Sequence, residues 1–229
     1  MKLGIFILHY NTTELTQRLG NSIPEAIIID NGSDTPFSSR AHQVLRLDKN
    51  YGFTKGWNKC IEHYYEQFDA FWLMNSDIII SRESIDRIKL LLLDQQAAIL
   101  TPSFNCWMEH VNNYNTEGVR DVKVIEFTAP VVRKCVFDSI GKFDERFSRG
   151  WGVEFDFCYR AKQSGYLTYV DDGSNFYHIG QQTIHISEGS TDYNKQAHTE
   201  WMKGMTGLYG KDWQKNLFGD INYIDKIKV

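Results

Sequence analysis

Acidic side chains follow two apolar runs of the chain at the point where each run ends. Asp30 comes directly after the run 26–29, and Asp77 closes the segment Asn75–Asp77 that follows the run 70–74. In open α/β sheets, ligands bind beyond the carboxyl ends of the strands, so both carboxylates are expected at a cleft. Carboxylate oxygens also suit a divalent cation that binds a diphosphate. A turn or cap role is an equal alternative for either residue alone, but the two together favour a ligand site.

A second pair of carboxylates lies in the later half of the chain. Glu154 and Asp156 stand two residues apart in a segment with a helical pattern, so they point to different faces of the expected helix. One can enter a cleft and act as a general base on a hydroxyl, while the other caps the helix or pairs with Arg160. The alternative is that both simply stabilise the first helical turn against its dipole.

His178 is a candidate metal ligand, because it follows the apolar run 166–170 and so lies near a strand end. A single histidine is more often structural than metal-binding, and that alternative stays open here. His185, in the polar loop 180–192, is a weaker candidate of the same kind.

The elements that must position these residues alternate in the first half of the chain. Strands are predicted at 3–8, 26–29, 44–47, 70–74 and 97–100, and helices at 13–20, 56–68 and 84–96. Strand–helix alternation indicates an α/β fold with a mostly parallel, Rossmann-like central sheet flanked by helices. The strand ends then bring together Tyr10, Asn11, Asp30 and the segment 75–77.

The second half has a different pattern. Strands are predicted at 122–127 and 166–170, helices at 134–140, 154–164 and 196–208, and an irregular tail after them. Apolar residues in the tail 211–229 must cover their own domain or a second copy of the chain, which leaves a homo-oligomer open.

Composition excludes several classes of protein. The 229 residues suit a single domain, and the net charge of −4 without a long basic run argues against nucleic acid as the main partner. The four cysteines form no C-x-x-C pair, which disfavours zinc and predicts free, mostly buried thiols in a reducing compartment. No apolar stretch approaches ~20 residues, so we expect no transmembrane segment and a cytoplasmic protein. Trp107, Trp151 and Trp201 are expected either in the core or stacked on sugar rings.

Several short motifs follow one another in a characteristic order. They are His9-Tyr10-Asn11, Ile29-Asp30-Asn31-Gly32-Ser33, Asn50-Tyr51-Gly52-Phe53 with Gly56-Trp57-Asn58, Met74-Asn75-Ser76-Asp77, Gly141-Lys142-Phe143-Asp144-Glu145, and Glu154 to Arg160 with Gly165-Tyr166. Together they resemble the family 2 glycosyltransferases, especially the rhamnosyltransferase-like branch, over about residues 3–183. The resemblance implies a GT-A fold with a mixed, acceptor-side second half.

The resemblance also implies a reaction and a set of ligands. The expected activity is an inverting transfer of a hexosyl or deoxyhexosyl group from a UDP-, dTDP- or GDP-sugar to a hydroxyl of a glycan, a lipid-linked sugar or another acceptor. Chain 1–229 is then one domain, with a donor-binding half (1–100), an acceptor and catalytic half (101–210) and a tail (211–229). The donor-binding residues that it implies are Tyr10, Asn11, Asp30, Asn50, Gly52, Phe53, Asn58, Asn75 and Ser76.

The same resemblance assigns the chemistry to a few side chains. Asp77 and His178 are expected to hold Mn2+ or Mg2+, Glu154 to be the base, and Asp156 to support the site. The family's Glu-Asp pair is Val153-Glu154 here, so the base is one methylene longer than usual. Two alternatives remain, a catalytically degenerate protein that binds a nucleotide sugar and a sugar nucleotidyltransferase. The second is disfavoured because the segment 9–13 lacks a Gly-rich loop with Lys or Arg.

Overall fold

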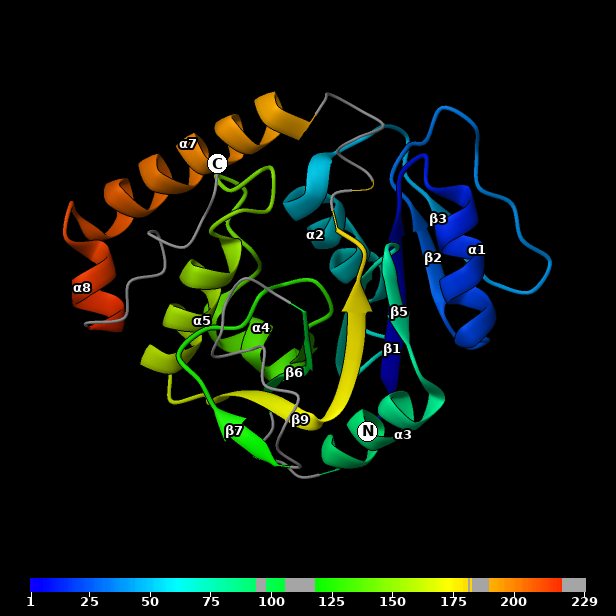
Figure 1. Ribbon diagram of the computed structural model, residues 1–229, viewed down its shortest axis with the longest axis horizontal. Coiled ribbons are helices and arrows are strands. Elements are labelled where there is room, and N and C mark those ends of the chain that lie inside the picture. The colour runs from blue at the N-terminus through cyan, green and yellow to red at the C-terminus, as the bar shows by residue number, and fades with distance from the viewer. Residues whose placement is uncertain (94–97, 106–117, 181, 183–189, 220–229) are drawn as a thin grey trace.

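The computed structural model describes residues 1–93, 98–105, 118–180, 182 and 190–219 (Figure 1). Its strands are β1 (Leu3–His9), β2 (Ile27–Asp30), β3 (Val44–Arg46), β4 (Ala70–Asn75), β5 (Ile78–Ile80), β6 (Ile99–Phe104), β7 (Val119–Asp121), β8 (Val131–Arg133) and β9 (Thr168–His178). Its helices are α1 (Thr13–Ser22), α2 (Gly52–Tyr64), α3 (Arg82–Leu91), α4 (Lys134–Ile140), α5 (Val153–Gln163), α7 (Ser190–Tyr209) and α8 (Trp213–Phe218).

The described strands form one sheet in the order β3-β2-β1-β4-β8-β6-β9-β5, and β7 pairs with β9. β3, β2, β1 and β4 run parallel to one another. β8 runs antiparallel to both β4 and β6, whereas β6 and β9 are parallel. The prediction of an α/β fold with a largely parallel sheet and a mixed second half is therefore confirmed.

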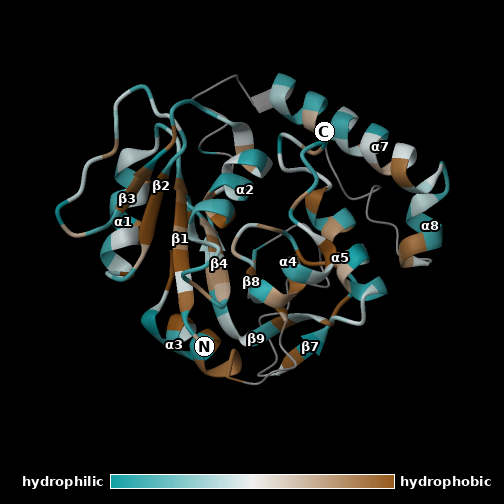
Figure 2. Cartoon of the chain, turned by 180° about the vertical axis from the view of Figure 1, so that it is seen from behind, coloured by the Kyte–Doolittle hydropathy of each residue, from teal (hydrophilic) through white to brown (hydrophobic). Residues whose placement is uncertain are grey.

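Helices cover both faces of the sheet. α1 and α3 lie on the face that is turned toward the viewer in Figure 1, and α2, α4 and α5 lie on the face seen in Figure 2. Because both faces are covered, β1, β2 and β4 are apolar along nearly their whole length and buried. Aromatic rings fill the space under α2, where Phe6 packs against Tyr64 and Phe71 at centroid distances of 5.1 and 5.8 Å.

α7 and α8 close the molecule over α5. Trp201 of α7 and Trp213 of α8 are each 1% exposed and pack on Phe155, with centroid distances of 4.9 and 6.0 Å. The burial of Trp201 selects the core alternative for this residue. Trp151 is half-buried, and Trp107 lies outside the described residues.

Several short or displaced elements differ from the prediction. β5 and β8, each three residues long, carry too few residues to show a period, and α8 lies in the tail that was expected to be irregular. α2 begins at Gly52 instead of Gly56. β9 continues to residue 178, so His178 is the last residue of the strand rather than a residue after it.

The strand predicted at 122–127 was wrong. The segment is largely buried, but its backbone does not follow one neighbouring strand. The Val122 amide donates to the Thr168 carbonyl at 2.8 Å, whereas further along the Thr128 and Pro130 carbonyls accept from Asn75 and Leu73 of β4, each at 2.9 Å. The apolar pattern of 122–127 thus reflects the burial of the segment and not its pairing with a neighbouring strand.

Cys60 and Cys158 are free and buried as expected, Cys135 is exposed, and Cys106 lies outside the described residues. None of the helices in the described part of the chain is both long enough and apolar enough to cross a membrane.

Candidate functional site

Asp77 lies in the tight connection between β4 and β5, at the carboxyl edge of the parallel strands. Its side chain is 8% exposed. The neighbouring Ser76 hydroxyl lies 2.9 Å from the Thr12 hydroxyl at the start of α1, and Thr12 also lies 3.4 Å from Nδ1 of His9. Buried hydroxyl contacts therefore tie the Asp77 turn to the end of β1.

His178 reaches Asp77 because β5 and β9 are antiparallel. Ile78 pairs with His178 in register, and the Ile179 amide donates to the Asp77 carbonyl at 2.9 Å. As a result, His178 Nε2 lies 3.3 Å from Asp77 Oδ1. Burial lowers the pKa of His178, but its hydrogen bond to the Asp77 carboxylate and the charges of Asp77 and Glu126 outweigh this effect, so the pKa is above its ordinary value.

The Asp77–His178 pair fits a divalent cation that also binds a diphosphate. Within the described residues, no three acidic, histidine or cysteine side chains form a complete metal cluster. Mg2+ and similar ions, however, commonly take one or two protein ligands and complete their shell with phosphate oxygens and water. The 3.3 Å between Nε2 of His178 and Oδ1 of Asp77 would let both atoms contact one such ion. These two residues would hold the ion.

Glu154 lies in the first turn of α5, where the chain enters the helix through Gly152 in a left-handed conformation (φ 89°). A Cβ at Gly152 would lie 2.1 Å from the Trp201 ring, so this entry requires glycine. The Glu154 side chain is buried. Its pKa is raised to about 8, chiefly by burial and also by the charge of Glu126, while backbone hydrogen bonds near the helix start oppose the rise.

Asp156 faces away from that position. Its Oδ2 accepts from Arg160 at 2.7 Å and its Oδ1 accepts from the Tyr209 hydroxyl of α7 at 2.7 Å. The pairing with Arg160 is the alternative that spacing along the helix predicted. Asp156 thus ties α5 to α7, whereas Glu154 lies in a different environment, buried and with a raised pKa.

Asp30 closes the turn after β2. Its oxygens accept from the backbone amides of Ser33 and Phe37, each at 2.9 Å, and from the Arg46 guanidinium. Burial opposes ionisation, but these hydrogen bonds prevail and hold the pKa of Asp30 below its ordinary value. Because Asp30 is 0% exposed, its contacts shape the turn, and a direct contact with a base would require the turn to open.

The end of β1 joins the same turn. The Asn11 amide donates to the Ser33 hydroxyl at 3.0 Å, and the Asn11 side chain exchanges hydrogen bonds with Asp34 at 2.9 and 3.0 Å. Asn11 adopts a positive φ of 54°, which asparagine tolerates. Tyr10, beside it, is half-buried.

The residues at the start of α2 bind mainly to neighbouring chain. Asn50 Oδ1 accepts from the Gly52 amide at 2.8 Å, and Phe53 packs edge-on against Trp57. Asn58 is buried and exchanges hydrogen bonds with the Phe143 backbone at 2.9 and 3.2 Å. Its place is therefore between α2 and the segment 143–145, where it joins the two halves of the chain.

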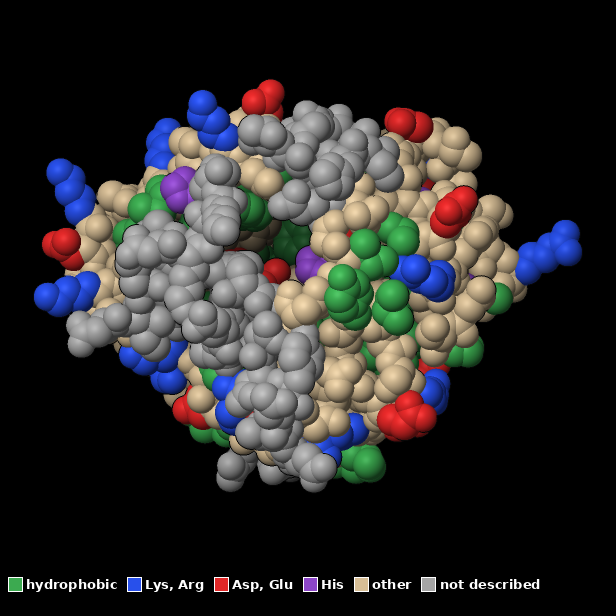
Figure 3. Space-filling view, viewed as in Figure 1, with side chains coloured by type: hydrophobic (Ala, Val, Ile, Leu, Met, Phe, Trp, Pro, Cys, Tyr) green, Lys and Arg blue, Asp and Glu red, His purple; other side chains and the backbone are tan. Residues whose placement is uncertain are grey.

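The structure brings the predicted residues together unevenly. Asp77 and His178 are in contact, and Tyr10, Asn11, Asp30, Asn75 and Ser76 lie on the adjacent ends of β1, β2 and β4. Figure 3 shows a hollow near the middle of one face with a histidine and an acidic side chain at its wall. Sequence reasoning missed Glu126, whose charge acts on both His178 and Glu154. Its one signal was a lone acid in the run 124–132. His185 lies outside the described residues.

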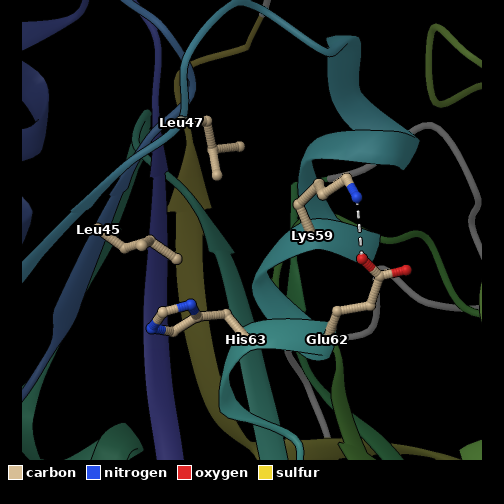
Figure 4. A pocket seen from close by; sticks show the side chains of 5 residues that line it. All are labelled: Leu45, Leu47, Lys59, Glu62 and His63. Atoms are coloured by element: carbon tan, nitrogen blue, oxygen red, sulfur yellow. Dashed lines mark hydrogen bonds and ion pairs between the residues drawn. The ribbon is translucent and has the colours of Figure 1, made fainter.

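A separate pocket lies between β3 and α2, lined by Leu45, Leu47, Lys59, Glu62 and His63 (Figure 4). Lys59 and Glu62 form an ion pair of 3.1 Å there. β2 and β1 separate β3 from β4 in the sheet, so this pocket is distinct from the Asp77 site.

Solved glycosyltransferase structures share this fold. The chain matches GalNAc-T7 in complex with UDP, GalNAc and Mn2+ with a TM-score of 0.64 and 9% identity, over 94% of this chain and 54% of that one. It matches residues 1–349 of S. aureus TarS in complex with UDP-GlcNAc with a TM-score of 0.61 and 14% identity, over 100% of this chain and 77% of that one. The chain thus spans about half the length of GalNAc-T7.

Comparison of sequences is less informative. No family model matches the chain. Curated relatives include the uncharacterized proteins Rv1525 of Mycobacterium tuberculosis and Mb1552 of Mycobacterium bovis, each 24% identical over 218 residues, which is 90% of this chain and 83% of the relative.

The fold is therefore that of the GT-A glycosyltransferases, an α/β fold with a mixed, largely parallel sheet between helices.

Proposed function

We propose that the protein is a metal-assisted, inverting glycosyltransferase that moves a sugar from a nucleotide-diphosphate-sugar to an acceptor hydroxyl. The observation that carries the proposal is the 3.3 Å approach of Asp77 to His178 at the carboxyl edge of the sheet. Two segments about a hundred residues apart converge there with the ligand atoms that a diphosphate-bound cation takes. The fold shared with GalNAc-T7 and TarS, whose structures hold UDP and UDP-GlcNAc, supports a UDP-type donor, with dTDP and GDP as the other candidates.

In this proposal the donor lies along the ends of β1, β2 and β4. Tyr10 packs near the base, and Asp30 with Asn11 holds the turn that receives it. Asn75 and Ser76 lie beside the diphosphate. The adjoining wall of the donor site is formed by Asn50, Gly52, Phe53 and Asn58. Mn2+ or Mg2+, bound by Asp77 and His178, would neutralise charge on the departing nucleoside diphosphate.

Glu154 is the proposed general base. Its carboxylate takes the proton of the acceptor hydroxyl as that oxygen bonds to the anomeric carbon, and the bond from this carbon to the diphosphate oxygen breaks. Attack opposite the leaving group inverts the anomeric centre. Asp156 supports this arrangement by fixing α5 against α7 through Tyr209.

A second candidate function is binding of a nucleotide sugar without transfer. The burial of Glu154 favours it, because a pKa of about 8 leaves most of the carboxyl protonated at neutral pH. Substrate binding would have to bring charged or polar groups to Glu154 for it to act as a base at that pH.

A thermal-shift panel tests the donor site. UDP-, dTDP-, GDP- and CMP-sugars are each added with and without Mn2+, and a ligand at about 100 times its Kd stabilises the fold by about 2.7 kcal/mol. For a chain of this size we expect the melting temperature to rise by about 5 °C or more with one nucleotide, and only with metal. No metal-dependent rise with any of these nucleotides would contradict the proposal.

A further inference from the structure

Glu126 lies in a segment that is held between α5 and the sheet. Its neighbours Ile125 and Phe127 are buried, and Phe127 packs on Phe157 of α5 and on Phe143 at centroid distances of 5.7 and 5.3 Å. The side chains of both neighbours thus pack in the core, whereas Glu126 is only half-buried. It is a charged residue within an otherwise apolar, tightly packed run.

The other side of the segment is fixed to the end of β4. The Asn75 amide donates to the Thr128 carbonyl at 2.9 Å, and the Thr128 hydroxyl donates to Glu126 Oε1 at 3.1 Å. Asn75 is two residues from Asp77. The Glu126 carboxylate is therefore oriented by a residue whose backbone is bound to the strand that leads to the Asp77–His178 pair.

Glu126 is also electrostatically close to both parts of the proposed machinery. Its charge contributes to the raised pKa of His178 on β9 and of Glu154 on α5. The contacts of its neighbours agree with this, because Phe127 packs on Phe157 of α5 and Thr128 accepts from Asn75 of β4, so Glu126 lies in a segment between the helix of Glu154 and the strand that leads to Asp77.

We propose that Glu126 is an acceptor-binding residue, whose carboxylate accepts a hydrogen bond from a second hydroxyl of the acceptor and so orients a sugar acceptor between Glu154 and the Asp77–His178 pair. The proposal rests on the proposed function. A carboxylate is an acceptor only, and it forms strong hydrogen bonds with hydroxyl donors. It repels the donor's diphosphate, so its ligand is the neutral, polyhydroxylated acceptor.

The test compares Glu126→Gln and Glu126→Ala with wild type and with Glu66→Gln, a control at a side chain that is 85% exposed. Once the donor is identified by the thermal-shift panel, transfer is measured to a sugar glycoside and to ethanol, which has no second hydroxyl. We expect both Glu126 variants to raise the KM for the glycoside about 10- to 100-fold. The KM for ethanol and the affinity for Mn2+ should stay within about twofold of wild type, as should every property of Glu66→Gln.

A carbon-13 NMR titration of Glu154 supplies a readout that needs no donor. The charge of Glu126 acts on Glu154 from the segment 125–127, and Asp156 and Cys158 are the other titratable groups near Glu154 on its own helix. Removing the charge in Glu126→Gln should lower the pKa of Glu154 without unfolding the protein.

The outcomes separate the two proposals. An unchanged glycoside KM, or an unchanged Glu154 titration in a folded variant, would overturn the role of Glu126. A tenfold or greater loss of Mn2+ affinity would also overturn it, by making Glu126 a metal ligand instead. Failure of the wild type to bind any nucleotide sugar would instead overturn the proposed function, and with it the acceptor role.

Discussion

At the scale of single residues, the neighbouring groups determine the environment of each acidic side chain. Glu154 and Asp156 stand two residues apart on one helix, yet Asp156 is paired with Arg160 and Tyr209 while Glu154 is buried beside the charge of Glu126. Their spacing along the sequence predicted that these two side chains point to different faces of the helix. It did not reveal Glu126, because an acid in an apolar run belongs to no motif and acquires neighbours only through folding.

The raised pKa of Glu154 makes stability depend on pH. Its folded-state pKa of about 8 exceeds its unfolded value near 4.5, so its protonated form stabilises the fold fully below pH about 4.5. That contribution is lost as the pH rises from about 4.5 to about 8, because the unfolded chain releases the proton first. We expect Glu154→Gln, which stays neutral, to remove this part of the pH dependence in urea unfolding between pH 5 and 8. The same slope in wild type and variant would contradict the assignment.

The metal pair makes a separate prediction. Asp77→Asn and His178→Ala should each abolish the Mn2+-dependent part of the thermal shift with nucleotide, because each removes one of two protein ligands. Mutation of a residue that only hydrogen-bonds a metal ligand already costs about 10- to 100-fold in metal affinity, so loss of a ligand should cost at least as much. Asp86→Asn, at an exposed side chain of α3, is the matched control and should behave as wild type. Retention of the metal effect in both ligand variants would exclude this site.

At the scale of elements, the sequence predicted the strands whose apolar pattern extends over several residues. The runs that became β1, β2 and β4 are buried on both faces and were recognised by continuous apolar residues. β5 and β8 were missed because three residues show no period, and 122–127 was mistaken for a strand because burial without a ladder leaves the same apolar pattern. His178 reaches Asp77 only through the β5–β9 pairing, which no local sequence pattern predicts.

The contact between α5 and α7 gives a prediction at this scale. Tyr209→Phe removes the hydroxyl that donates to buried Asp156 at 2.7 Å, and loss of a hydrogen bond to a charged, buried group costs about 1.5–3 kcal/mol. We expect that decrease in the free energy of unfolding, measured with urea. Tyr177→Phe, at a tyrosine that is 57% exposed, is the control and should change it by less than about 0.5 kcal/mol. Equal stability of the two variants would show that the contact contributes nothing.

At the scale of the whole molecule, one sheet carries the donor-side and acceptor-side parts of the candidate site. β4 from the first half pairs with β8 from the second, and β5 pairs with β9 beside the metal pair, so the two halves of the chain are joined at two places in the sheet. The overall fold could be predicted from alternating patterns and from the resemblance of the motifs. The contact of Asp77 with His178 could not, because it depends on a strand pairing between residues a hundred positions apart in the chain, Ile78 and His178.

The most direct test of glycosyl transfer is a comparison of wild type with Glu154→Gln, in which donor binding and transfer are measured separately on the nucleotide sugar that the thermal-shift panel selects. The account predicts that the variant binds donor and Mn2+ as wild type does, and that its transfer rate falls by about 10²- to 10⁴-fold, the usual contribution of a general base. Donor binding by the wild type without transfer or hydrolysis, or full transfer by Glu154→Gln, would contradict it.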